Sequence, residues 1–243
     1  MPGLEPARRR AIVRDGLAVG VATGAYGLSF GAIAVTSGLD VWQACALSLP
    51  AFTGASQFAL VGVVGAGGAP LSGMATGLLL GTRNTLYGLR LSTLLGFRGA
   101  RRAAAAQLVI DESTAMSVNR ESGEAARVGF LATGLAVFVL WNAATFVGAL
   151  AGNALGDPKA WGFDSAVGGA FLALLWPRLR DRRNQVCAVL AAALALVLVP
   201  VVPAGVPVLA AGVVALGLGL LGRDTSDPTE VPDPDDLPEG GLR

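Results

Sequence analysis

Long apolar segments, separated by short polar ones, dominate the sequence. They lie at residues 16–36, 41–67, 70–96, 127–152, 163–177, 185–200 and 204–222. About 20 predominantly apolar residues suffice for a helix to span a bilayer. A weaker segment, 103–118, contains two acidic residues. The pattern predicts an all-α fold: a polytopic transmembrane helical bundle of about seven or eight spans, depending on whether segment 103–118 crosses the membrane.

The composition supports a body buried in a lipid bilayer. Hydrophobic residues make up 53% of the 243-residue chain, and its mean hydropathy is +0.61. Charged residues make up only 14%, whereas a typical soluble domain has about 25%. The chain also has 34 glycines, which suit the close approach of helices in lipid.

The two ends of the chain differ from this body. Residues 1–15 are expected to form a basic cytoplasmic N-terminus, because arginines such as Arg8 and Arg14 precede the first apolar segment. That segment has full spanning length and no clear cleavage site, so we expect it to remain as a transmembrane helix. Residues 224–241 hold seven acidic residues and no basic one, with several prolines. This composition predicts a disordered acidic, Pro-rich tail over 224–243 and a transmembrane domain over 16–223.

The basic clusters give conflicting indications of topology. Arginines between 178 and 183 place the loop after Pro177 on the cytoplasmic side, as they do for the N-terminus. Counting 103–118 as a span satisfies both clusters but puts Arg98, Arg101 and Arg102 outside. A re-entrant segment somewhere in 41–118 would change the count. The sequence leaves these alternatives open.

A break is expected in the second apolar segment, near residues 50–57. Pro50 removes a backbone hydrogen bond, and Gly54 weakens the helix further. The freed backbone groups need partners in protein or water, and Ser56 and Gln57 offer polar side chains there. This is typical of a discontinuous helix at a substrate site. The alternative is a kinked helix in which Ser56 and Gln57 bond neighbouring helices.

Arg83 lies near the middle of the third apolar segment. An arginine at the centre of a transmembrane helix costs roughly 2.5–3.5 kcal/mol on insertion scales, so it needs a partner, a water-filled cavity or a ligand. Tyr87 and Arg90 follow on the same helical face. Arg83 could bind a ligand carboxylate in a bidentate fork. It could equally form a structural ion pair with an acidic residue, and Arg90 is near enough to the helix end to anchor at the interface.

Three acidic residues are candidates for proton coupling: Asp111, Glu112 and Asp164. A carboxyl group can bind protons near neutral pH if burial raises its pKa. Asp111 and Glu112 follow an apolar stretch and point about 100° apart on a helix. The alternatives are that both are solvated near a helix end, and that Asp164 only complements a helix dipole.

Enzymatic and metal chemistry find little support in the sequence. The chain has no histidine, and Cys45 and Cys187 show no metal-binding or redox spacing. It contains neither a His-Glu-x-x-His motif nor a Gly-x-Ser-x-Gly elbow. We therefore expect no enzyme activity, no cofactor, no metal and no nucleic-acid partner.

Three short motifs together resemble the AzlC/BrnF-type branched-chain amino acid permeases. They are residues 54–59 (Gly-Ala-Ser-Gln-Phe-Ala), Arg83 with Leu-Tyr-Gly at 86–88, and Asp111-Glu112, within a match from about Gly16 to Arg183. The resemblance implies the large subunit of an exporter in the bacterial inner membrane, driven by the proton gradient. It also implies a small hydrophobic membrane subunit of the AzlD/BrnE type as a partner.

One position departs from that family. Asn84 stands where the family usually has a histidine after the arginine. If that histidine handles protons or touches substrate, this chain does so by other means, for which Asp111 or Glu112 is available.

The leading hypothesis is a multi-pass exporter of branched-chain, aliphatic amino acids. Its expected substrate-binding residues are Gly54, Ser56, Gln57, Arg83, Asn84 and Tyr87. Two rival functions remain: a transporter or channel for another small solute or ion, and a non-transporting membrane scaffold subunit.

Overall fold

The described part of the chain is helical throughout its regular structure. The computed structural model describes residues 4–118, 120–154, 172 and 175–221. Its helices are α1 (Pro6–Gly24), α2 (Tyr26–Thr36), α3 (Val41–Ser48), α4 (Gly54–Gly65), α5 (Pro70–Leu95), α6 (Gly99–Ala106), α7 (Asp111–Val118), α8 (Gly123–Ala154), the 3-10 helix η2 (Trp176–Arg180), α10 (Arg182–Leu198) and α11 (Val206–Leu221). The all-α prediction is confirmed for these residues.

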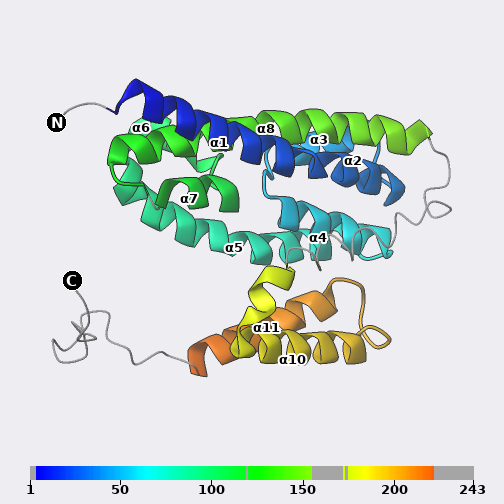
Figure 1. Ribbon diagram of the computed structural model, residues 1–243. Coiled ribbons are helices and arrows are strands. Elements are labelled where there is room, and N and C mark those ends of the chain that lie inside the picture. Colours follow the sequence, from blue (N-terminus) through cyan, green and yellow to red (C-terminus); the bar gives the residue numbers. More distant parts are fainter. Residues whose placement is uncertain (1–3, 119, 155–171, 173–174, 222–243) are drawn as a thin grey trace, which may run out of the picture.

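Two long apolar rods form one layer of the bundle. The α1 and α2 helices follow one another through Ala25, whose backbone is itself helical, so that residues 6–36 make one 31-residue rod. This rod packs along α8, which has 32 residues (Figure 1). Within the described residues, these are the two helices long and apolar enough to cross a membrane. Seven or eight complete spans are therefore not confirmed.

Several segments expected as spans are shorter helices. Segment 41–67 divides into α3 with 8 residues and α4 with 12, and segment 103–118 divides into the end of α6 and α7. At 1.5 Å per residue, an 8-residue helix is only about 12 Å long, whereas the hydrocarbon core is about 30 Å thick. The predicted break near 50–57 is confirmed, since residues 49–53 separate the two helices. Segment 163–177 lies largely outside the described residues.

The two short helix pairs enter the bundle from opposite ends. Helices α3 and α4 lie toward the end where α8 finishes, and α6 and α7 lie toward the end where α1 begins, with α5 running between the ends (Figure 1). The turns of the two pairs meet midway, where the Gln107 amide donates to the carbonyl oxygens of Leu49 at 2.8 Å and Pro50 at 3.2 Å. Two pairs of short helices thus stand where single helices were expected at 41–67 and 103–118.

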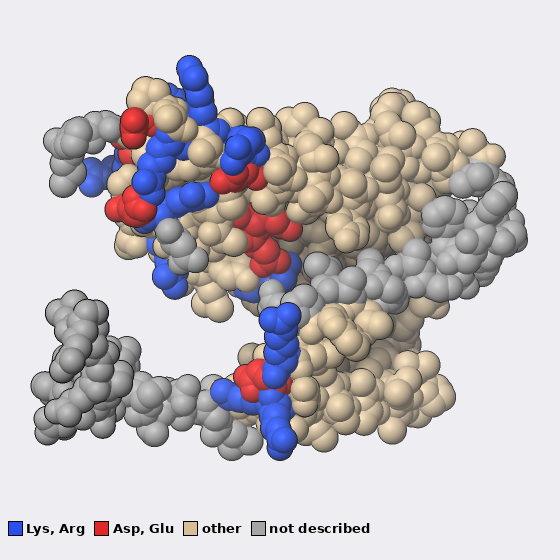
Figure 2. Space-filling view, viewed as in Figure 1, with Lys and Arg blue, Asp and Glu red and all other residues tan. Residues whose placement is uncertain are grey.

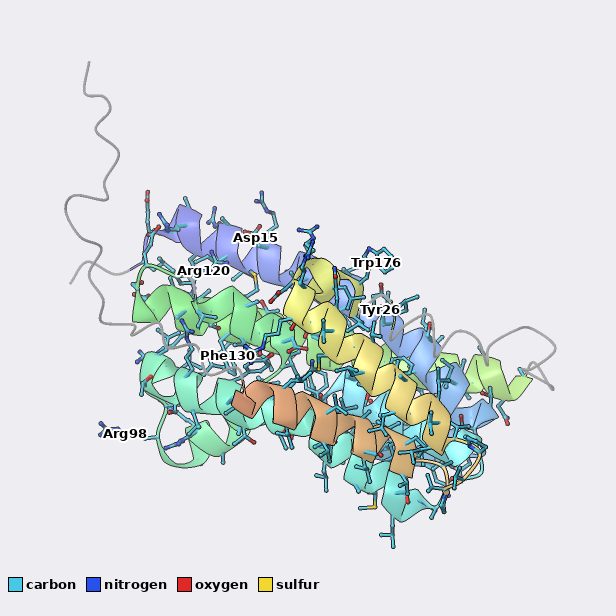
Figure 3. All side chains as sticks on the ribbon, turned by 90° about the horizontal axis from the view of Figure 1, so that it is seen from below. Asp15, Tyr26, Arg98, Arg120, Phe130 and Trp176 are labelled. Carbon is cyan, nitrogen blue, oxygen red and sulfur yellow. The ribbon has the colours of Figure 1, made fainter. Side chains whose placement is uncertain are left out.

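Charged side chains gather at the end where α1 begins, and a second group lies over η2 and the start of α10 (Figure 2). Contacts between distant segments hold this end together: the Leu4 amide donates to Glu124 at 3.0 Å, and the Arg127 guanidinium donates to the Leu95 carbonyl at 2.6 Å. Figure 3 places Arg98 at the same end as the start of α1. The arginines after α5 therefore share an end with those of the N-terminus, whereas three full spans at 16–36, 41–67 and 70–96 would have put them at opposite ends.

The first helix begins at Pro6, within the basic N-terminal segment, and its exposed early turns contain the arginines of that segment. Proline suits the first positions of a helix, where its missing N–H is not needed. The predicted tail at 224–243 lies outside the described residues. Helices α10 and α11 form a hairpin beside α5 (Figure 1).

Glycines permit close contact between the two rods. A Cβ atom added at Gly31 on α2 would lie 2.0 Å from the Thr145 carbonyl oxygen on α8, and one added at Gly148 would lie 2.0 Å from the Leu28 carbonyl oxygen. Real Cβ atoms do not approach backbone oxygens this closely. Such contacts let helices associate in lipid, where hydrophobic driving force between them is absent.

We predict that Gly148→Ala lowers the thermal stability of the purified protein. The added methyl group must push α2 away from α8, and such overpacking costs about 1–3 kcal/mol. Gly88→Ala is the matched control, because a Cβ there meets nothing within 4 Å and alanine favours helix over glycine. Detergent melting curves would provide the comparison. Equal midpoints for the two variants would contradict the close packing of α2 on α8.

Candidate functional site

A cavity of about 260 Å³ lies where the interrupted helices meet. Its walls come from the α1–α2 junction, the start of α4, the middle of α5, the start of α7 and the middle of α8. The lining residues are Thr23, Tyr26, Phe52, Thr53, Gly54, Ala55, Phe58, Arg83, Ile110, Asp111, Glu112, Val137 and Trp141. Figure 3 shows Tyr26 near the middle of the molecule. The cavity is thus central and mixes an apolar wall with a few charged groups.

An ion pair between α5 and α7 borders the cavity. Arg83 Nη2 lies 2.8 Å from Asp111 Oδ2, and the two side chains are 30% and 34% exposed. Within the described part of the chain, Arg83 Nε and Asp111 Oδ1 have no hydrogen-bond partner. The pair therefore neutralises both charges while leaving one donor and one acceptor for something else.

Glu112 supplies a second carboxylate beside the pair. It interacts with the Thr23 hydroxyl, with its own backbone amide and with the charges of Asp111 and Arg83. The charged residues that line the cavity are thus one cation and two anions. With both acids ionised, the cavity carries one negative charge in excess, which favours a bound proton or an ammonium group.

The start of α4 presents backbone donors to the same cavity. Thr53 is extended, and α4 begins at Gly54 without a side-chain cap. The first N–H groups of a helix lack intrahelical partners, and the helix N-terminus carries a partial positive charge. Because Thr53, Gly54 and Ala55 line the cavity, this positive end is available to an anionic group there.

Two glutamines satisfy the carbonyl groups that the break releases. Gln57 Nε2 donates to the Ser48 carbonyl oxygen at 3.2 Å, and Gln107 Nε2 donates to the carbonyl oxygens of Leu49 and Pro50. Gln57 also accepts a hydrogen bond of 3.0 Å from Trp141 Nε1, and it is only 1% exposed. Buried backbone groups without partners are costly, so these bonds stabilise the interruption between α3 and α4.

The structure brings some predicted site residues together and separates others. Gly54, Arg83, Asp111 and Glu112 share the cavity. Ser56 and Gln57 are buried on α4 and border another hollow, between α3, α4 and α5.

The remaining predicted residues lie outside the cavity. Asn84 borders a hollow of about 470 Å³ next to α6, which Arg102 also lines. Tyr87 is half-buried on α5 and is not among the residues that line the cavity. Asp164 lies outside the described residues.

The sequence analysis missed most of the apolar wall. Phe52, Phe58, Ile110 and Val137 are all at least nine-tenths buried, as is Trp141. One feature of the sequence did set Trp141 apart. It lies in the middle of a long apolar segment, whereas tryptophans at the membrane interface lie near segment ends. Its neighbour Asn142, the more conspicuous polar residue, donates to the Phe138 carbonyl of its own helix at 2.8 Å.

We predict that Arg83→Met destabilises the protein and that adding Asp111→Asn restores part of the loss. The single change leaves two acids without a cation, at a cost of about 1–3 kcal/mol for a pair one-third exposed. Asp15→Asn should have little effect, because the Arg14–Asp15 pair is 82% and 48% exposed. The test is a double-mutant cycle on melting temperature. Additive losses at Arg83 and Asp111 would show that the pair is energetically unimportant.

The AzlC protein family model matches residues 18–155 of this chain. That range covers more than half of the sequence and includes every residue that lines the cavity. No curated protein and no solved structure was found to match the chain.

Proposed function

This chain belongs to the AzlC family, and from that premise we propose that it exports branched-chain amino acids through the cavity beside Arg83. Members of the family are membrane transporters. The observation that carries the proposal is the cavity itself, which combines one cation, two anions and an apolar wall. A free amino acid with an aliphatic side chain has the complementary groups: a carboxylate, an ammonium and an apolar body.

Arg83 and the start of α4 would hold the substrate carboxylate. Arg83 keeps its Nε donor unused in the described structure, and a guanidinium binds carboxylates with two parallel hydrogen bonds. Backbone donors from Gly54 onward would add a second contact to the same carboxylate. Discontinuous helices with their N-termini toward anionic groups are a common design in secondary transporters.

The two acids would bind the ammonium group and the coupling proton. A substrate carboxylate at Arg83 competes directly with Asp111, which lies 2.8 Å from that guanidinium. Once displaced, Asp111 is left without its cation, and we propose it as the acceptor of the coupling proton. Glu112 remains to face the ammonium group. Binding of substrate and of a proton would then be linked through one arginine.

The apolar wall would select small aliphatic side chains. Pockets for drug-sized ligands typically measure about 300–1,000 Å³, and the cavity here is about 260 Å³. Phe52, Ile110 and Val137 contribute aliphatic and aromatic surface without polar groups. The space accordingly favours a ligand the size of a single amino acid.

A small membrane subunit would cover the outer face of α3, α4 and α5. These helices border a largely apolar groove of about 900 Å³, and Leu71 and Leu78 on α5 are 77% and 72% exposed. The helices α3 and α4 are too short to seal a bilayer alone. We propose a hydrophobic AzlD-like partner here, in the bacterial inner membrane with the arginine-rich end in the cytoplasm.

We predict that proteoliposomes containing this chain and its small subunit release labelled leucine, and that Arg83→Gln slows release about tenfold or more. Removing one member of a partly exposed charge pair costs about 1–3 kcal/mol. Arg90→Gln is the matched control, since Arg90 is exposed one turn beyond Tyr87 on the same helix. Release of another solute but not leucine would favour the rival transporter, and undiminished leucine release by Arg83→Gln would contradict the site.

We predict that Asp111→Asn uncouples leucine release from an imposed pH gradient while preserving leucine–leucine exchange, and that Glu112→Gln slows both because it loses the contact to the substrate ammonium group. Exchange needs no net proton movement, so it continues without a titrating carboxyl group. Asp164→Asn tests the third candidate acid, and Glu5→Gln at the exposed start of α1 is the control. If all three site variants retain the pH dependence of the unmodified protein, a membrane carboxylate does not carry the coupling.

A further inference from the structure

Trp141 is fixed among aromatic rings in the middle of α8. It is 5% exposed, yet it borders the cavity. The Phe30 ring stacks on it with centroids 6.2 Å apart and planes 24° apart, and the Phe58 ring meets it edge-on at 6.3 Å and 88°. Aromatic pairs of these geometries stabilise a fixed orientation. The indole therefore has little freedom to swing aside.

A hydrogen-bond chain ties this indole to the broken helix. Trp141 Nε1 donates to Gln57 Oε1 at 3.0 Å, and Gln57 Nε2 donates to the Ser48 carbonyl at 3.2 Å. Gln57 thus uses both ends of its amide, one on α8 and one on the last turn of α3. Its position holds the ring of Trp141 relative to the start of α4.

The indole meets the start of α4 at closest range beside Gly54. A Cβ atom added at Gly54 would lie 2.9 Å from Trp141 Cη2. The ring edge therefore occupies the space directly beside the helix end at which the substrate carboxylate is proposed to bind. A substrate held there by its carboxylate places its side chain next to the wall that contains this ring.

We propose that Trp141 sets the upper size limit for the substrate side chain and that Gln57 positions its ring. This rests on the proposed amino acid transport through the cavity. Trp141 is the bulkiest residue of the apolar wall, and its orientation is fixed by three aromatic and amide contacts. Because well-packed interiors do not yield to extra volume at low cost, side chains larger than leucine are excluded.

The test measures competition between leucine and phenylalanine. Proteoliposomes with the small subunit release labelled leucine while unlabelled phenylalanine competes, and the ratio of the two apparent affinities is the readout. Trp141→Leu should shift this ratio roughly tenfold or more toward phenylalanine, because pocket volume discriminates side chains by such factors. Trp141→Phe, which keeps an aromatic ring in the cluster, should give a smaller shift in the same direction.

The role of Gln57 has its own readout. Gln57→Met keeps the shape of the side chain but removes both hydrogen bonds, so it should shift the ratio in the same direction as Trp141→Phe. In Trp141→Leu, adding Gln57→Met should change the ratio no further, because a positioning residue acts only through the ring it holds. Trp42→Leu is the matched control: Trp42 is 75% exposed on α3 and does not line the cavity.

The outcomes separate the inference from the proposed function. If the unmodified protein does not release labelled leucine, the proposed function fails. If it releases leucine but the Trp141 variants lower the apparent affinities for leucine and phenylalanine by the same factor, Trp141 has a purely structural role and the inference is overturned. A shift of the ratio in Trp42→Leu equal to that in Trp141→Leu would overturn it as well.

Discussion

The ion pair between Arg83 and Asp111 is the interaction on which the central site depends. A guanidinium in apolar surroundings needs an anion, and at 2.8 Å Asp111 provides it. Asp111 can reach α5 only because a new helix, α7, starts at that residue in the interior of the bundle. The same pair holds the charges that we assign to substrate and proton. Its formation therefore links the fold to transport.

The two interruptions that create the site depend on each other. Ending α3 at Ser48 releases the buried carbonyl group of Ser48 and the exposed ones of Leu49 and Pro50, to which the amides of Gln57 and Gln107 donate. Gln107 belongs to the turn of the opposite helix pair, so each turn stabilises the other. Discontinuous helices with their ends in the middle of the bundle are a common design in secondary transporters.

The sequence predicted the parts of the site that carry a distinctive residue type. Pro50 and Gly54 predicted the break, and Arg83 within an apolar segment predicted the position of the cavity. The sequence offered three acids as partners of Arg83 and could not single out Asp111. The interruption at 107–110 was missed because Gln-Leu-Val-Ile contains no proline or glycine, so an apolar run looks the same as one helix or two. Trp141 was missed because a single aromatic residue in an apolar helix gives no sign of which face it occupies. Ser56 and Gln57 have the polar groups of ligands, but the structure shows Gln57 occupied by Ser48 and Trp141.

We propose that an amino acid binds between Arg83 and the start of α4. Thr53 borders this space, and the two cysteines of the chain, Cys45 and Cys187, are both free, so a variant with serine at both positions carries no other thiol. In that background, the rate at which a small thiol reagent labels Thr53→Cys measures access to the cavity. The account predicts that saturating leucine slows this labelling, with no slowing in the Arg83→Gln variant. Labelling that proceeds at the same rate with and without leucine, in a protein that still exports leucine, would contradict it.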